Sequence, residues 1–417
     1  MTRLEVYAGT SRVGIDLEEG KAIAVHRQAQ APVLEDVAGH IYQALEAPLD
    51  GYPPLRRALT ADDRVVIVVN EALLALPILV QGVADYLLQA GIARGRIRLL
   101  CAPRLPGIQP RWFERLPGHL RQLPVEVHDP HNRARLCYLA STQKGRRIYL
   151  NRSLVEADAV VVIGRTVYDP IFGYAGGSAD LFPALGDSET REQLWRLPTE
   201  NVPGDHLWPI LQEADEVAWL LGVPFFVQGV EGPGDELSHI LAGLAEPVAR
   251  ASRKLLDRYW RVTVAGRAEL VIAGIGGDPA GQSFVELARA FACAARIVQP
   301  GGHIAVVSAL RQPVTALGEW FRDTQRPLEA LVRVRRERSP LALTVWQLAV
   351  AAERAHLYLL SDLDADQVEQ LHVTPLRHAA DLQRLAQRSG TCIVLPDAHK
   401  TMALTGPDLA KKSSASH

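Results

Sequence analysis

Short, almost wholly apolar stretches constrain this chain more than any other feature of its sequence. Residues 64–69 spell RVVIVV and residues 158–164 spell DAVVVIG. Continuous runs of this kind are typical of strands buried on both faces of a parallel sheet, since a half-exposed strand alternates apolar and polar residues. A helical pattern over 77–91 follows the first run, and RIRLLCA at 96–102 is the next strand pattern. A strand, a helix and a strand in this order predict a parallel sheet flanked by helices.

The second half of the chain repeats this alternation. Strand patterns that alternate with helix patterns begin at ELVIAGIGG and end at TCIVLP, residues 391–396. A chain of 417 residues is too long for one ordinary core. We therefore predict an α/β protein with two α/β domains and a cleft between them, the second domain being a smaller doubly wound sheet.

The domain boundaries follow from where the patterns change. An N-terminal α/β domain that carries a glycine loop is expected over residues 1–262, and its first 25 residues alternate weakly, as in a short hairpin. A Rossmann-like C-terminal α/β domain is expected over 263–400, followed by a flexible polar tail over 401–417.

Composition excludes several classes of partner. Lys plus Arg (45) and Asp plus Glu (47) leave a formal net charge of −2, which gives no electrostatic reason to expect nucleic acid or an anionic membrane as partner. No apolar run is long enough for a membrane span, and acidic residues occupy the place of a signal sequence. The four cysteines form no CxxC pair, so neither disulfides nor a thiolate zinc site is implied. We expect a cytoplasmic protein whose partner is a small molecule in the interdomain cleft.

Two glycine-rich turns follow strand patterns: GYAGGSAD at 173–180 and GIGGDPAG at 274–281. Backbone amides in such turns can hold a phosphate or another anion, but glycines also serve in plain tight turns, and neither turn spells the dinucleotide fingerprint. Both interpretations stay open. The HDPH segment at 128–131 could bind a metal but favours a solvated turn, and no GxSxG sequence supports a Ser-His-Asp set.

Several motifs in the same order resemble the nickel-dependent lactate racemase family. DDRVVIVVNEALLALP resembles the family's strand that leads into an Asp-x-Thr-Arg turn, and FGYAGGSADLFPAL resembles its Gly-Phe-Ser-Gly-Gly-x-Lys loop. The segment from HDPHNRARL to AVVVIG, and GGDPAGQSFVELARA in the second half, resemble further family segments. The resemblance covers most of residues 3–310.

This resemblance implies a chemistry. Members of the family interconvert stereoisomers of 2-hydroxy acids with a nickel pincer nucleotide, a nicotinate-derived cofactor that accepts and returns a hydride. A lysine in the glycine loop holds the cofactor covalently, a later histidine completes the nickel coordination, and two further histidines transfer protons.

The family's reactive positions hold other residues in this chain. Ala179 stands at the position of the cofactor lysine, and Asp169 at that of one catalytic histidine. The segment CAPRLPG has no histidine at the place where the family has its second catalytic histidine. The position of the family's nickel-binding histidine falls on or near Trp195. Glu71 stands at the position of the aspartate in the Asp-x-Thr-Arg turn, and Leu74 replaces the arginine of that turn.

The resemblance assigns the remaining site residues. Asp169 and Glu71 are the candidates for acid and base, and Glu286 and Arg289 are the candidates for substrate binding. The candidates for cofactor binding are the loop residues Gly173, Tyr174, Gly176 and Gly177, and no residue is assigned to a metal.

Two functions remain open. The first is a divergent racemase or epimerase of a 2-hydroxy acid or related compound, with an unknown cofactor, since Ala179 cannot form the covalent link of the nickel pincer nucleotide. The alternative is a non-catalytic binding or regulatory paralogue, which would work as a homo-oligomer or beside an intact homologue.

Overall fold

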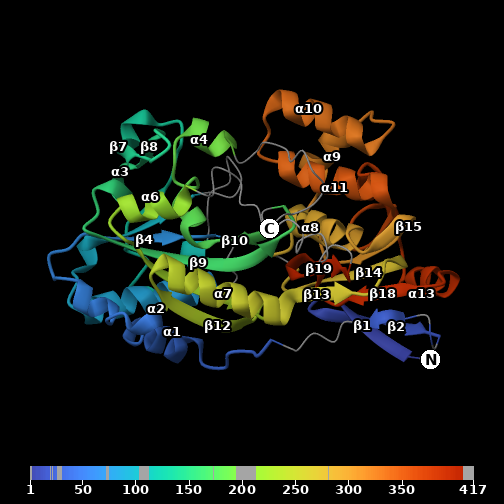
Figure 1. The fold of residues 1–417 in the computed structure, drawn as a ribbon, viewed down its shortest axis with the longest axis horizontal. Coiled ribbons are helices and arrows are strands. Elements are labelled where there is room, and N and C mark those ends of the chain that lie inside the picture. Colours follow the sequence, from blue (N-terminus) through green and yellow to red (C-terminus); the bar gives the residue numbers. More distant parts are fainter. Residues whose placement is uncertain are drawn as a thin grey trace, which may run out of the picture.

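The chain folds around two large β-sheets. The structure is a computed structural model that describes residues 2–18, 20, 22–25, 31–71, 75–102, 112–171, 173–193, 213–279 and 281–406. Figure 1 shows the first sheet and its helices at the left, in blue to yellow, and the second at the right, mostly in orange and red. Parallel pairing dominates both sheets, which confirms the predicted α/β class.

The first sheet has the strand order β12-β11-β9-β4-β5-β6, with β10 added beside β9. Only β12 and β10 are antiparallel to their neighbours. The wholly apolar runs become its central strands, β4 and β9, as predicted. The strands are β4 (Val65–Val69), β5 (Ile97–Cys101), β6 (Val125–Val127), β9 (Ala159–Asp169), β10 (Gly173–Ala175), β11 (Phe225–Glu231) and β12 (Leu237–Gly243).

Helices cover both faces of the first sheet because both faces of β4 are apolar. Val65, Ile67 and Val69 pack toward the core that includes α1 and α2, and Val66 and Val68 toward the core that includes α6 and α7. The helices of this half are α1 (Val37–Glu46), α2 (Leu76–Gln89), α3 (Arg152–Val155), α4 (Ser188–Glu192), α6 (Ala214–Leu220) and α7 (Ala245–Trp260). An antiparallel hairpin, β7 (Leu136–Ser141) with β8 (Arg147–Asn151), precedes α3.

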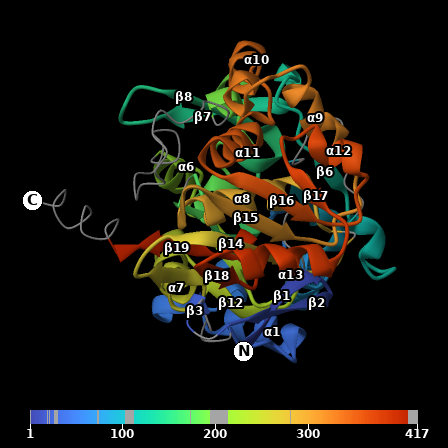
Figure 2. The ribbon, with the colours of Figure 1, turned by 90° about the vertical axis from the view of Figure 1, so that its right-hand side faces the viewer.

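The second sheet runs in the order β17-β16-β15-β14-β1-β2, and β18 pairs with both β14 and β3. Figure 2 shows β14 to β17 side by side, with α8 and α11 beside them. Its later strands are β14 (Ala268–Gly276), β15 (Val298–Val307), β16 (His356–Leu360), β17 (Thr374–Leu376) and β18 (Cys392–Leu395). Its helices are α8 (Phe284–Ala295), α9 (Thr315–Phe321), α10 (Ala330–Glu337), α11 (Ala342–Arg354), α12 (Ala365–Glu369) and α13 (Ala379–Arg388).

The N-terminal hairpin belongs to the second sheet, and its expected place in the first domain is therefore wrong. β1 (Thr2–Gly9) and β2 (Ser11–Leu17) form the predicted hairpin, but β1 pairs in parallel with β14, and β3 (Ala22–Val25) pairs with β18. Apolar residues of the hairpin, including Val6 and Ile15, share a buried core with Ile272 of β14. Burial of that apolar face gives the hairpin its position (Figure 1).

The segment after residue 400 also differs from the prediction. Residues 402–405 form β19 (Met402–Thr405), which pairs in parallel with β13 (Arg261–Val264) and is buried. The flexible tail expected from residue 401 therefore cannot begin there, and residues 407–417 lie outside the described part of the chain. A boundary near residue 262 and a cleft between the domains stay predictions. In the part of the chain that the structure describes, no helix is both long and apolar enough to cross a membrane.

Candidate functional site

The glycine loop folds back on the strand that precedes it. β9 does not end at Gly164, as the sequence pattern predicted, but continues to Asp169. β10 then returns antiparallel to it, with Gly173 opposite Asp169. A short 3₁₀ helix, η6 (Gly177–Asp180), follows. The loop therefore lies against the carboxyl-terminal part of β9, the region where α/β sheets bind ligands.

Backbone geometry accounts for the loop glycines. Gly173, Gly176 and Gly177 have φ of +78°, +111° and +64°, a region that other residues rarely adopt. A Cβ atom on Gly176 would lie 1.9 Å from the carbonyl oxygen of Arg165. Of the two open interpretations, the tight turn is therefore sufficient to explain these glycines, and anion binding stays a prediction.

Tyr174 contacts α7. Its hydroxyl donates a hydrogen bond to Asp257, and the guanidinium of Arg253 lies 5.6 Å from its ring centroid. These contacts fix the side chain against α7, so its predicted cofactor contact stays untested.

Asp169 and Arg289, predicted as catalytic acid or base and as substrate ligand, bind each other. Nη2 of Arg289 donates to Oδ2 of Asp169 at 2.8 Å, and the two side chains are 16% and 6% exposed. The backbone N–H of Ile171 donates to Oδ1 of Asp169 at 2.8 Å. Since Arg289 lies on α8, the pair joins the first sheet to a helix of the second.

Glu286 and Glu71 lie in different surroundings. Glu286 accepts hydrogen bonds from the backbone N–H and the hydroxyl of Ser283, and so forms a capping box at the start of α8. Glu71 follows β4 and lies near the Cys101 thiol, whose pKa is raised by burial and then by the Glu71 carboxylate. The structure therefore joins two of the four predicted catalytic and substrate-binding residues in one contact, Asp169 with Arg289.

The described residues do not fit a covalently held nickel pincer nucleotide. Ala179 in η6 carries a methyl group, and no lysine occurs between residues 173 and 186. The buried Lys400 donates to the carbonyl oxygens of Gly232 and Gly234, so its amine is engaged elsewhere. Within the described ranges, no group of three or more His, Cys, Asp or Glu residues could hold a metal. The predicted positions Trp195 and Leu74 lie outside those ranges.

The sequence interpretation missed a row of polar residues that lies level with the carboxyl end of β4. Asn70 directly follows β4, and its neighbour Val69 pairs with Ile163, next to Gly164 on β9. Gln228 of β11 pairs directly with Gly164. Asp180, at the end of η6, accepts a hydrogen bond of 2.7 Å from Nδ2 of Asn70. An amide residue inside or just after an apolar run, as in VVN and FFVQ, is the sequence signal that could have identified this row.

Asp180 has an unusual electrostatic environment. Burial raises the pKa of its carboxyl to about 7, although the hydrogen bond from Asn70 and the charge of Arg165 act in the opposite direction. A carboxyl that titrates near neutral pH can donate or accept a proton under physiological conditions.

A second group of charges lies between the two halves of the chain. Nη1 of Arg165 donates to Oε1 of Glu231 at 2.7 Å, and Nζ of Lys400 lies 3.6 Å from Oε2 of Glu231. Asp397 contacts Lys400 at 3.9 Å and His399 at 2.9 Å. Burial raises the pKa of Glu231, but the charges of Arg165 and Lys400 outweigh it and lower the pKa to about 2. These charged groups compensate one another, as buried charges require.

His128, the first residue of the HDPH segment, has a structural contact. Its ring is 2% exposed, and burial lowers its pKa to about 4, so the imidazole is neutral at pH 7. Its Nε2–H donates to the carbonyl oxygen of Gly186 at 2.8 Å. This bond ties the segment after β6 to the chain that follows the glycine loop.

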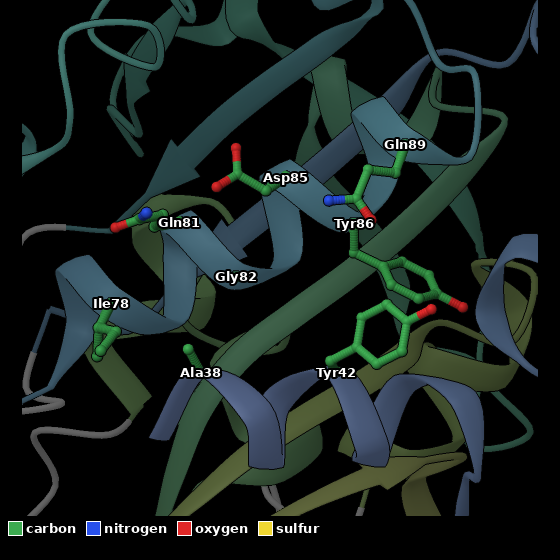
Figure 3. Close-up of a pocket in the computed structure, with 8 residues that line it drawn as sticks. All are labelled: Ala38, Tyr42, Ile78, Gln81, Gly82, Asp85, Tyr86 and Gln89. Carbon is green, nitrogen blue, oxygen red and sulfur yellow. The ribbon is translucent and has the colours of Figure 1, made fainter. Parts of the chain in front are cut away.

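A surface pocket of about 250 Å³ lies between α1 and α2 (Figure 3). Tyr42 and Tyr86 meet edge to face there, with ring centroids 5.8 Å apart, and Asp85 and Gln81 line another part of it. The pocket contains none of the site residues predicted from the sequence.

The family, sequence and structure comparisons each find a match among lactate racemases. Residues 8–199 match the family model described as the lactate racemase N-terminal domain. The lactate racemase of Thermoanaerobacterium thermosaccharolyticum is 18% identical over 417 positions, which cover 93% of this chain and 95% of the relative. The lactate racemase apoprotein structure from that organism covers 96% of this chain and 100% of its own, with a TM-score of 0.76 and 16% identity. A crystal structure of a Thermotoga maritima protein covers 88% and 98%, with a TM-score of 0.63 and 13% identity.

Proposed function

We propose that this chain, whose residues 8–199 match the lactate racemase N-terminal domain, is within that family a non-catalytic binding or regulatory paralogue that has lost the nickel pincer cofactor site. The ion pair between Asp169 and Arg289 carries the proposal. A group that transfers protons must face the substrate, and a cation attracts a substrate carboxylate less strongly when a carboxylate of the protein already pairs with it. Here the two candidate groups neutralise each other in a buried contact.

The surroundings of the pair support the same conclusion. Ala179 offers no amine for a covalent cofactor, and Glu286 caps α8. Tyr174 binds Asp257 on α7. The family scaffold is retained, while Asp169, at one of its reactive positions, makes contacts within the protein. The ligand of such a paralogue would be a small molecule, and its protein partner a second copy or an intact homologue.

One observation favours the second candidate function, a divergent racemase or epimerase of a 2-hydroxy acid or related compound. Asp180 lies beside Ala179 with a pKa raised to about 7, mainly by burial, and could serve as a general acid or base. It would act beside the carboxyl end of β4 and over Gly164 of β9, near the cationic Arg165.

A combined experiment separates the two functions. The protein is produced together with the enzymes that make the pincer cofactor, and its intact mass is compared with that of protein made without them. Its turnover of D- and L-lactate and related 2-hydroxy acids is then measured as loss of optical purity, which detects both hydride return by a cofactor and proton transfer at C2.

We expect an unchanged mass and no turnover above buffer. A mass increase that maps to residues 173–186 would contradict the loss of the cofactor site. Turnover that disappears in an Asp180→Asn variant would establish the second candidate instead.

A further inference from the structure

Three buried polar atoms over the central strands of the first sheet have no hydrogen-bond partner among the described residues. They are Oε1 and Nε2 of Gln228 and Oδ2 of Asp180. The Gln228 side chain is fully buried, at 0% exposure. Buried polar atoms are nearly always paired, because an unpaired one forfeits its hydration without compensation. Three such atoms at one place therefore indicate a missing partner.

The three atoms crowd together at the position that a Cβ atom of Gly164 would take. A Cβ atom built on Gly164 would lie 2.2 Å from Oδ2 of Asp180, 2.9 Å from Nε2 of Gln228 and 3.1 Å from Oε1 of Gln228. Any side chain at residue 164 would displace these groups. The glycine thus lets Asp180 and Gln228 approach the backbone of β9 from two different elements. This position lies beside the carboxyl end of β4 and over the middle of β9 and β11.

The donor and acceptor pattern of these atoms selects the partner. Gln228 offers one donor group and one acceptor. Asp180 offers an acceptor when ionised and a donor when protonated, since burial raises its pKa to about 7. A carboxylate or phosphate only accepts, so it would leave Oε1 of Gln228 without a donor in either protonation state of Asp180. An ammonium only donates, so it would leave Nε2 unpaired. A hydroxyl group both donates and accepts, and two adjacent hydroxyls would satisfy all three atoms.

We propose that Asp180 and Gln228 form a binding site for adjacent hydroxyl groups of an uncharged polyol. This inference rests on the proposed function, according to which the chain binds a small molecule. It adds where that molecule binds and to which chemical class the molecule belongs. Asn70 is the positioning residue, since its bond to Oδ1 aims Oδ2 toward Gln228.

The test is a titration of the full chain with glycerol, erythritol and ribitol, followed by saturation-transfer NMR, with D- and L-lactate in parallel. Gln228→Leu removes both amide atoms at nearly constant volume, and Gly164→Ala fills the position. Gln81→Leu, in the pocket between α1 and α2, makes the same chemical change elsewhere (Figure 3). We expect saturable binding of at least one polyol, at least tenfold weaker in Gln228→Leu and Gly164→Ala, and unchanged in Gln81→Leu.

A second measurement does not depend on the choice of polyol. If the amide of Gln228 lacks a partner in the ligand-free protein, Gln228→Leu should raise the melting temperature by about 2 °C or more, because it removes a buried unsatisfied group. An unchanged or lower melting temperature, together with no polyol binding by the parent, would show that a fixed water or a protein group satisfies the amide and would overturn the inference.

The remaining outcomes separate this inference from the proposed function. Lactate or polyol binding that survives Gln228→Leu would leave a binding protein but place the ligand elsewhere, and so reject this site. Covalent cofactor attachment or turnover would reject the non-catalytic function. If Gln228→Leu also abolishes polyol binding in that case, the polyol site is retained.

Discussion

Asp169 at the end of β9 and Arg289 on α8 lie 120 residues apart in the chain and form a buried ion pair with an N–O distance of 2.8 Å. The pair ties the strand that leads into the glycine loop to the first helix after β14. Because it joins the two halves of the chain, it bears on stability as well as on function.

Removal of one member of this ion pair should lower the stability of the protein. Arg289→Met leaves the Asp169 carboxylate buried without its cation, and we expect the free energy of unfolding to fall by about 3 kcal/mol or more. Urea unfolding measures the change. The Arg289→Met/Asp169→Leu double variant should recover much of the loss, because it removes both charges. Arg311→Met is the matched control, since its ion pair with Asp362 is exposed and should be worth less than about 1 kcal/mol. Equal effects at both arginines would contradict the structural role of the pair.

Two neighbouring glycines should differ in their tolerance of alanine. Gly177→Ala has open space around the new Cβ and incurs only the cost of its φ of +64°, about 1 kcal/mol. Gly176→Ala adds a collision with the carbonyl oxygen of Arg165, so its loss of stability should be clearly larger. Thermal and urea unfolding of both variants check the order, and a reversed order would show that the loop follows a different path.

Asp180 should make the stability of the protein depend on pH. Burial raises its folded-state pKa to about 7, whereas the unfolded side chain titrates near about 4. Between these values the folded state holds a proton that the unfolded state has released, so the contribution of Asp180 to stability falls as the pH rises through this window. Asp180→Asn should therefore raise the free energy of unfolding by about 2–4 kcal/mol at pH 8 and by little at pH 4.

Urea titrations at pH 4, 6 and 8 measure this difference. The Arg165 and Glu231 charges face the same region, but they are present in both proteins, so the difference isolates Asp180. Asp62→Asn, at a carboxylate that is 96% exposed, is the control and should show no such trend. A difference that does not vary with pH would mean that Asp180 titrates normally.

Lys400 should contribute to stability through its buried charge. Lys400→Met leaves the carboxylates of Glu231 and Asp397 with less compensation, and we expect a loss of about 3 kcal/mol or more in the free energy of unfolding. Lys254→Met on α7 is exposed and should change stability by less than about 0.5 kcal/mol. Equal stability of the two variants in urea would show that the buried charges are not coupled as the distances indicate.

The sequence by itself determined the local elements and the fold class. The apolar runs at 64–69 and 158–164 became β4 and most of β9, and the pattern over 77–91 became α2, with Gly91 in the left-handed region just beyond it. These features depend on neighbours in the chain, because burial on both faces of a strand and one apolar face of a helix each leave a periodic pattern. The glycines at 173, 176 and 177 likewise predict a turn from the sequence alone.

Only the tertiary structure decided which distant segments meet. The pairing of β1 with β14 and of β13 with β19 joins residues more than a hundred positions apart, and no periodicity encodes such a choice. The same holds for the site: Asp169 became the partner of Arg289, and Asp180 and Gln228 met over Gly164. A side chain's protonation and its partners depend on burial and on charges brought from other elements, so the chemistry of this site arises from packing, which the order of residues along the chain does not display.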